Sequence, residues 1–77
     1  MANEHSKEKY KSVKIQIDMV RDKSIAATIT ERDSVRTMFI PRSAISYVSQ
    51  KAFGSIMTFP VTRYVDIAEW LCKREGI

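Results

Sequence analysis

Hydrophobic and polar residues alternate through the first part of the chain. In residues 12–20 (SVKIQIDMV), every second position from Val13 to Met19 is apolar and the positions between them are polar. This two-residue period predicts a strand with one buried and one solvent-facing side. The pattern continues in residues 24–31 (SIAATITE), where β-branched side chains also favour a strand. A third strand is predicted over residues 35–40 (VRTMFI).

Short polar turns separate these three predicted strands. Residues 21–23 and 31–34 are polar and charged. Connections of this length favour an antiparallel meander, because parallel pairing needs long crossovers. In the third strand we expect Phe39 to face the core and Ile40 to lie on the opposite side. Pro41 lacks an N–H group and should end that strand.

The pattern is weaker in the second half of the chain. The segment from Ser43 onward predicts a tight corner or a single helical turn, which leads into a short strand around residues 45–49. A further strand is predicted over residues 55–63, where apolar and polar positions alternate again. Pro60 should place this strand at a sheet edge or in a bulge.

A C-terminal helix is predicted over residues 67–75. Asp66 and Glu69 have the spacing of a capping box at its start. Gly76 occupies the position of a C-terminal cap. A longer helix that begins near Thr62 also fits the apolar positions.

Together these elements predict an α+β fold. We expect a strongly curved antiparallel sheet of four or five strands, an SH3-like or OB-like partial barrel, with one C-terminal helix. Residues 1–11 should form a flexible basic arm, which is either solvated or in contact with a phosphate backbone. Residues 12–77 should form one small domain, with Trp70 and Leu71 packed on the sheet beside Phe39 and the isoleucines of the first two strands.

The net charge, the length of the apolar runs and the cysteine content limit the possible binding partners and the cellular location of the protein. The chain of 77 residues has a formal net charge of +4, which favours contact with polyanions. No apolar run approaches the roughly 20 residues that span a membrane, so no membrane partner is expected. The single cysteine cannot form an internal disulfide, and we therefore expect a cytoplasmic protein.

Few residues are suited to catalysis. The one histidine, His5, lies in the predicted arm, and Cys72 lies beside Leu71 as a small core residue would. One cysteine and one histidine do not make a common structural zinc site. We expect no enzyme activity, no catalytic residue, no metal and no cofactor.

Two binding hypotheses remain open. The first is a nucleic-acid-binding accessory or regulatory protein, in which basic side chains near the turns contact phosphates and an aromatic ring stacks on bases. Its predicted residues are Arg21, Lys23, Arg32, Arg36, Arg42 and Tyr47. The alternative is a protein-interaction module that modulates a host protein complex through a sheet edge or through residues 47–53. The same edge could also pair with a second copy to form a homodimer.

Two stretches, RTMFIPRSAIS and IAEWLCKREGI, resemble segments of small uncharacterised proteins of phages and other mobile elements. In those proteins a strand ends in a proline, a basic residue and a serine, and a terminal helix carries Glu-Trp-Leu. This chain departs from the pattern with Phe39-Ile40 where the family often has tryptophan, and with a longer stretch over residues 47–65. The resemblance implies a small β-rich accessory protein and implies no activity.

Overall fold

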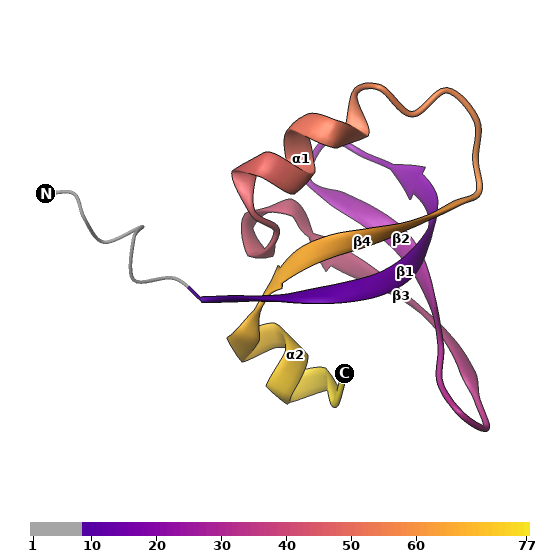
Figure 1. Ribbon diagram of the computed structural model, residues 1–77, viewed down its shortest axis with the longest axis vertical. Coiled ribbons are helices and arrows are strands. Elements are labelled where there is room, and N and C mark those ends of the chain that lie inside the picture. Colours follow the sequence, from indigo (N-terminus) through magenta and orange to yellow (C-terminus); the bar gives the residue numbers. More distant parts are fainter. Residues whose placement is uncertain (1–8) are drawn as a thin grey trace, which may run out of the picture.

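The computed structural model describes residues 9–77 as four strands and two α-helices joined by short turns (Figure 1). The chain folds first into a three-stranded meander and returns to it with a fourth strand after α1. In order, the elements are β1 (Tyr10–Val20), β2 (Ser24–Thr30), β3 (Val35–Pro41), the 3-10 helix η2 (Arg42–Ala44), α1 (Tyr47–Phe53), β4 (Val61–Ala68) and α2 (Glu69–Glu75). No helix in this described part is long and apolar enough to cross a membrane.

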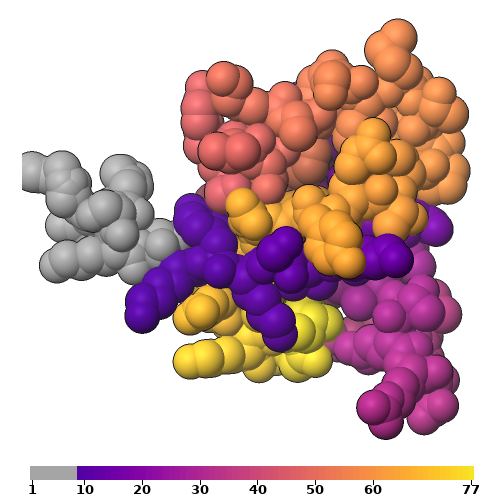
Figure 2. Space-filling model, viewed as in Figure 1, coloured from indigo at the N-terminus to yellow at the C-terminus, as the bar shows by residue number. Residues whose placement is uncertain are grey.

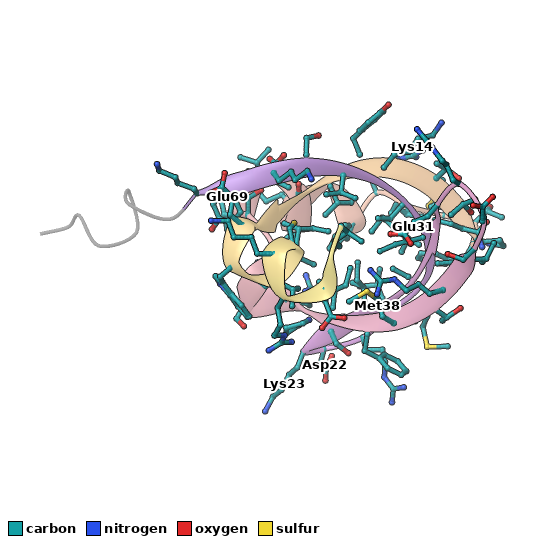
Figure 3. All side chains as sticks on the ribbon, turned by 90° about the horizontal axis from the view of Figure 1, so that it is seen from below. Lys14, Asp22, Lys23, Glu31, Met38 and Glu69 are labelled. Atoms are coloured by element: carbon teal, nitrogen blue, oxygen red, sulfur yellow. The ribbon has the colours of Figure 1, made fainter. Side chains whose placement is uncertain are left out.

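The four strands form one antiparallel sheet in the order β3-β2-β1-β4. The sheet is curved and open, so β3 and β4 are its two edges (Figure 3). In Figure 1, α1 lies above the sheet and α2 lies below it. The predicted α+β fold, with a curved antiparallel sheet and a C-terminal helix, is confirmed, and α1 is an additional helix. β1 begins at Tyr10, inside the predicted arm, whose first eight residues lie outside the described part.

The core lies on the inner side of the curve. It is built mainly from isoleucines, as the alternating pattern of the first two strands predicts. Leu71 is also fully buried in this core, as predicted, but its predicted neighbour Phe39 is not part of the core. The largest fully buried side chains are Ile15, Ile17, Ile25, Ile40, Ile45, Val65, Ile67 and Leu71.

A β-bulge changes the pattern near the end of β1. The register with β2 shifts between Ile17 and Met19. An extra residue in one strand exchanges the two faces beyond it. Met19 is therefore exposed, although the alternation predicts it to be buried, and Val20 packs against the core instead.

The face of β3 that meets the core is the opposite of the predicted one. Ile40 pairs with Ile25 and is fully buried, and Met38 lies inside the curve of the sheet (Figure 3). Phe39 is 63% exposed on the outer side. The cause is the register, because directly opposed residues share a face and a shift of one residue inverts every side chain.

The strand predicted over residues 45–49 is wrong, and the strand predicted over residues 55–63 forms later in the chain and overlaps the prediction only at residues 61–63. Ser46 begins α1, because its side chain accepts a hydrogen bond from the N–H of Ser49 at 3.1 Å and so caps the helix. The last strand, β4, starts only after Pro60 and pairs with β1 from Tyr10 to Ile17.

The C-terminal helix is shorter than predicted at its start. Asp66 belongs to β4 and the N-cap residue is Ala68, without a side-chain cap, so the predicted capping box is wrong. Trp70 is 48% exposed, lies beneath the Arg74 guanidinium and is not part of the buried core, so its predicted place in the core is wrong. The predicted C-terminal end is confirmed, since Gly76 has a φ of 74° and the next N–H donates to the Cys72 carbonyl at 2.9 Å.

Candidate functional site

A groove of about 330 Å³ runs between α1 and the edge strand β4. Figure 2 shows this side of the molecule, with α1 above the strand and residues 54–60 at the upper right. The groove is lined by Ser12, Val48, Ser49, Ala52, Phe53, Ile56, Arg63, Tyr64, Val65 and Asp66. Its helical wall is apolar except at Ser49, and its other polar groups lie along β4 and β1.

The helical wall follows from the spacing of residues along α1. Val48 and Ala52 are one helical turn apart, and so are Ser49 and Phe53, which places all four on the side that faces the groove. Phe53 is buried and anchors the helix on the core. Val48 is 73% exposed, so the groove presents an uncovered aliphatic side chain to solvent.

Hydrogen bonds from α1 define the direction of the backbone groups of β4. The Asp66 carbonyl accepts from the N–H of Ser46 at 3.1 Å, and the Asp66 N–H donates to Ser49 Oγ at 3.0 Å. Both backbone groups of Asp66 therefore point away from β1. Successive residues of a strand point to opposite edges, so Thr62 and Tyr64 also direct their N–H and C=O groups outward.

This outer edge is only partly occupied within residues 9–77. The Thr62 carbonyl accepts a hydrogen bond from Arg63 Nη1 at 3.3 Å. No strand pairs with β4 beside Tyr64, because β1 is its only partner in the sheet. The N–H and C=O of Tyr64 are thus open donor and acceptor groups beside an apolar groove.

The two ends of the groove differ in charge. Arg63 is exposed, and no carboxylate of the described residues lies within ion-pair distance of it. At the other end, Asp66 Oδ2 accepts a hydrogen bond from the Ser46 hydroxyl at 3.2 Å. The groove is therefore positive near Arg63 and negative near Asp66.

Three of the residues predicted to bind nucleic acid lie together at one end of the sheet. The N–H of Arg42 donates to the Lys23 carbonyl at 2.8 Å, and Arg42 Nη1 donates to the Arg21 carbonyl at 3.1 Å. Arg42 is also held by Gln50 of α1 at 3.3 Å and lies over the Phe53 ring. Its guanidinium is therefore largely committed to contacts within the domain.

The other predicted residues lie elsewhere. Arg32 is in the turn after β2, about 20 Å from the turn before it, given the length of a seven-residue strand. Arg36 is half-buried at that same far end, where its guanidinium lies 3.8 Å from Glu31 and 4.0 Å from Glu75 and donates to the Glu75 carbonyl. Tyr47 is 74% exposed on α1, beneath the Lys51 ammonium group.

Two titratable groups outside the groove have shifted pKa values. Hydrogen bonds from Thr28 (2.6 Å) and Gln16 (2.7 Å) hold the pKa of Asp18 below its ordinary value. Burial raises the pKa of the Cys72 thiol, which makes this cysteine a poor nucleophile. In residues 9–77, no three His, Cys, Asp or Glu side chains gather as a metal site would require.

The sequence predicted part of this groove only under the alternative hypothesis, which named a sheet edge and residues 47–53, and it did not name Arg63 or the other lining residues of β4. A usable signal was present, because Ser46 and Ser49 fit an N-cap and the N3 position, and Val48, Ala52 and Ile56 recur every four residues. The role of Arg63 carries no local signal, since it depends on β4 forming an edge.

The chain was also compared with known proteins. No protein-family model, no curated protein and no solved structure matches it. The resemblance to phage and mobile-element proteins therefore stays a prediction, and the function has to be argued from the groove and the strand edge.

Proposed function

We propose that this domain is a protein-interaction module that binds an extended segment of a partner protein along the outer edge of β4. The observation that carries the proposal is the open N–H and C=O of Tyr64 beside the apolar groove. A strand added at such an edge gains main-chain hydrogen bonds, and the adjacent groove selects its side chains.

The groove supplies the apolar part of the interaction. Val48 and Ala52 are exposed in the free domain, and an incoming aliphatic side chain would cover them. Full burial of one such side chain contributes about 1.5–3 kcal/mol. If the resemblance to mobile-element proteins holds, the partner is a protein of the host cell.

A displayed library of random linear peptides tests the proposal. We expect the immobilised domain to enrich peptides of one kind. Their affinity should be roughly tenfold lower for the Tyr64→Pro variant, because proline removes the outward N–H. The β1–β4 ladder should survive this change, since that N–H does not take part in it. Tyr64→Ala is the matched control, because it keeps the N–H and should bind with similar affinity.

A second variant keeps the test valid if Tyr64→Pro does not fold. Ala52→Trp fills the groove from an exposed position of α1, so it should block the same peptides while the melting temperature stays close to that of the wild type. Enrichment of no peptide, or binding that survives both changes, would overturn the proposal. A dimer in sedimentation equilibrium that Tyr64→Pro dissociates would instead assign the edge to a second copy.

A second candidate function is nucleic-acid binding at the turn between β1 and β2. The observation in its favour is that Arg42 holds the backbone of Arg21 and Lys23 beside it, so three cations share one end of the sheet. We expect labelled single-stranded DNA or RNA to bind with an affinity that falls as salt rises. Arg21→Glu combined with Lys23→Glu should abolish this binding, and no binding at low salt would exclude the hypothesis.

A further inference from the structure

We infer that the segment bound along β4 runs antiparallel to it and carries an apolar residue followed, two positions later, by an aspartate or glutamate. This inference rests on the proposed function, because it assigns the partner's chemistry at the same groove. It follows from three properties of the site: the direction of its backbone groups, the faces of its side chains and its charge.

The open backbone groups favour the antiparallel direction. In an antiparallel hydrogen-bonded pair, one partner residue exchanges two bonds with a single residue of the edge, and Tyr64 offers both groups. A parallel segment would instead bond to the N–H of Tyr64 and to the carbonyl of Thr62. That carbonyl already accepts a hydrogen bond from Arg63 Nη1 at 3.3 Å.

The faces of β4 place the partner's side chains. Val65 is buried on the inner face of the sheet, and Arg63 lies two residues before it on the same face. Directly opposed residues of antiparallel strands point to the same side. The partner residues opposite Val65 and Arg63 therefore both face the groove, and the residue between them, opposite Tyr64, faces away.

The surroundings of these two positions differ. Opposite Val65, a side chain meets the apolar wall of Val48, Ala52 and Phe53. Opposite Arg63, it meets a guanidinium that no carboxylate of the described residues neutralises. An acidic residue is favoured there, and the nearby Asp66 carboxylate disfavours one at the apolar end.

The sequence motif follows from this arrangement. Because the partner runs antiparallel, its residue opposite Val65 comes first in the chain and its residue opposite Arg63 comes second. From the N-terminus to the C-terminus the motif is apolar, any residue, acidic. The positive net charge of the domain would also speed the approach of an acidic segment.

Synthetic peptides of identical composition test the motif. One carries leucine and glutamate two residues apart in the inferred order, one carries them in reverse order and one has them adjacent, each within a threonine- and valine-rich strand sequence. We expect the first to bind about threefold to tenfold more tightly, since an exposed ion pair and partial apolar burial together contribute on this scale.

A substitution that reverses the charge of Arg63 tests whether this residue recognises the acidic side chain of the peptide. Arg63→Glu should reverse the preference, so that the peptide with lysine in place of glutamate becomes the tighter ligand. Arg32→Glu is the matched control, because it makes the same change of charge at an exposed turn far from the groove and should leave the preference unchanged.

The outcomes separate this inference from the proposed function. Peptides that need the Tyr64 N–H but show no preference for spacing or order, or whose preference survives Arg63→Glu, would overturn the motif and leave strand addition in place. Enrichment of the reversed order would overturn the antiparallel direction. If the library and the synthetic peptides all fail to bind, both proposals fall together.

Discussion

Ser46 and Asp66 are joined by two hydrogen bonds, one from the Ser46 N–H to the Asp66 carbonyl (3.1 Å) and one from the Ser46 hydroxyl to Asp66 Oδ2 (3.2 Å). The same hydroxyl oxygen accepts from the N–H of Ser49 and caps α1. One side chain therefore begins the helix and fastens it to the edge strand, so the width of the groove depends on Ser46.

Ser46→Ala should lower the free energy of unfolding by about 1–2 kcal/mol, because the helix loses its cap and the half-buried Asp66 loses a donor. Urea denaturation measures the change. Ser55→Ala is the control, since Ser55 makes a comparable hydrogen bond to Ala52 in an exposed position and its loss should cost less than about 0.5 kcal/mol. Equal losses in the two variants would show that the helix is not fastened through Ser46.

Leu71 and Trp70 are neighbours in α2, but the first side chain is buried and the second is half exposed. Alanine substitutions at the two positions can therefore be compared directly. Leu71→Ala should cost about 2–5 kcal/mol, because Leu71 is fully buried and a cavity would remain. Trp70→Ala should cost less than about 1 kcal/mol, because the indole is half exposed and lies outside the buried core. Thermal unfolding of both variants checks the order, and a greater loss for the tryptophan would contradict the position of the helix.

Asp18 should make stability depend on pH. Its pKa is lower in the folded state, so its stabilisation is present above the unfolded pKa of about 4 and is lost as the pH falls through the folded value. Asp18→Asn should therefore be less stable than the wild type at pH 7, by about 1 kcal/mol, and the difference should shrink in acid.

Urea titrations across the acid range measure this effect, with Asp33→Asn as the control. Asp33 is exposed in the turn between β2 and β3, so the same substitution there should change the free energy of unfolding at pH 7 by less than about 0.5 kcal/mol. A gap between wild type and Asp18→Asn that stays constant down to pH 2 would exclude ionisation of Asp18 as its cause.

Cys72 should react slowly in the native protein. It is 2% exposed, and burial raises its pKa, so little thiolate is present or accessible at neutral pH. The rate of labelling with a thiol-specific disulfide reagent should rise sharply in denaturing urea. Labelling that is equally fast with and without urea would show that the thiol is accessible in the folded state.

The sequence predicted the strands whose alternation is unambiguous. β1 and β2 each have one mainly apolar face, and both formed as strands, although the bulge in β1 exposes Met19. β3 has apolar residues on both faces, with Phe39 on one and Ile40 on the other, so its period does not identify the core side. The pairing of Ile40 with Ile25 determines which face of β3 meets the core. That pairing is a property of the assembled sheet, so it cannot be read from the β3 segment alone.

The sequence named residues 47–53 as a possible interaction segment, but it did not predict the groove that they form with β4. The sequence could place a cap at Ser46, but a helix of seven residues is too short to be recognised with certainty from its pattern. The open edge exists because β4 returns to pair with β1, and Arg63 matters because of that edge. The pairing of β4 with β1 and the position of Arg63 at an open edge are long-range features, so the local sequence around them does not indicate either one.

The strand order also has a consequence for the folding pathway. β1, β2 and β3 are joined by tight turns and can pair through local contacts, whereas β4 must find β1 across most of the chain, down to the pairing of Tyr10 with Ala68. Closing so long a loop costs entropy before any contact compensates for it, and such non-local pairing slows folding. Docking of β4 is thus expected to limit the rate, and the groove comes into being only in that final step.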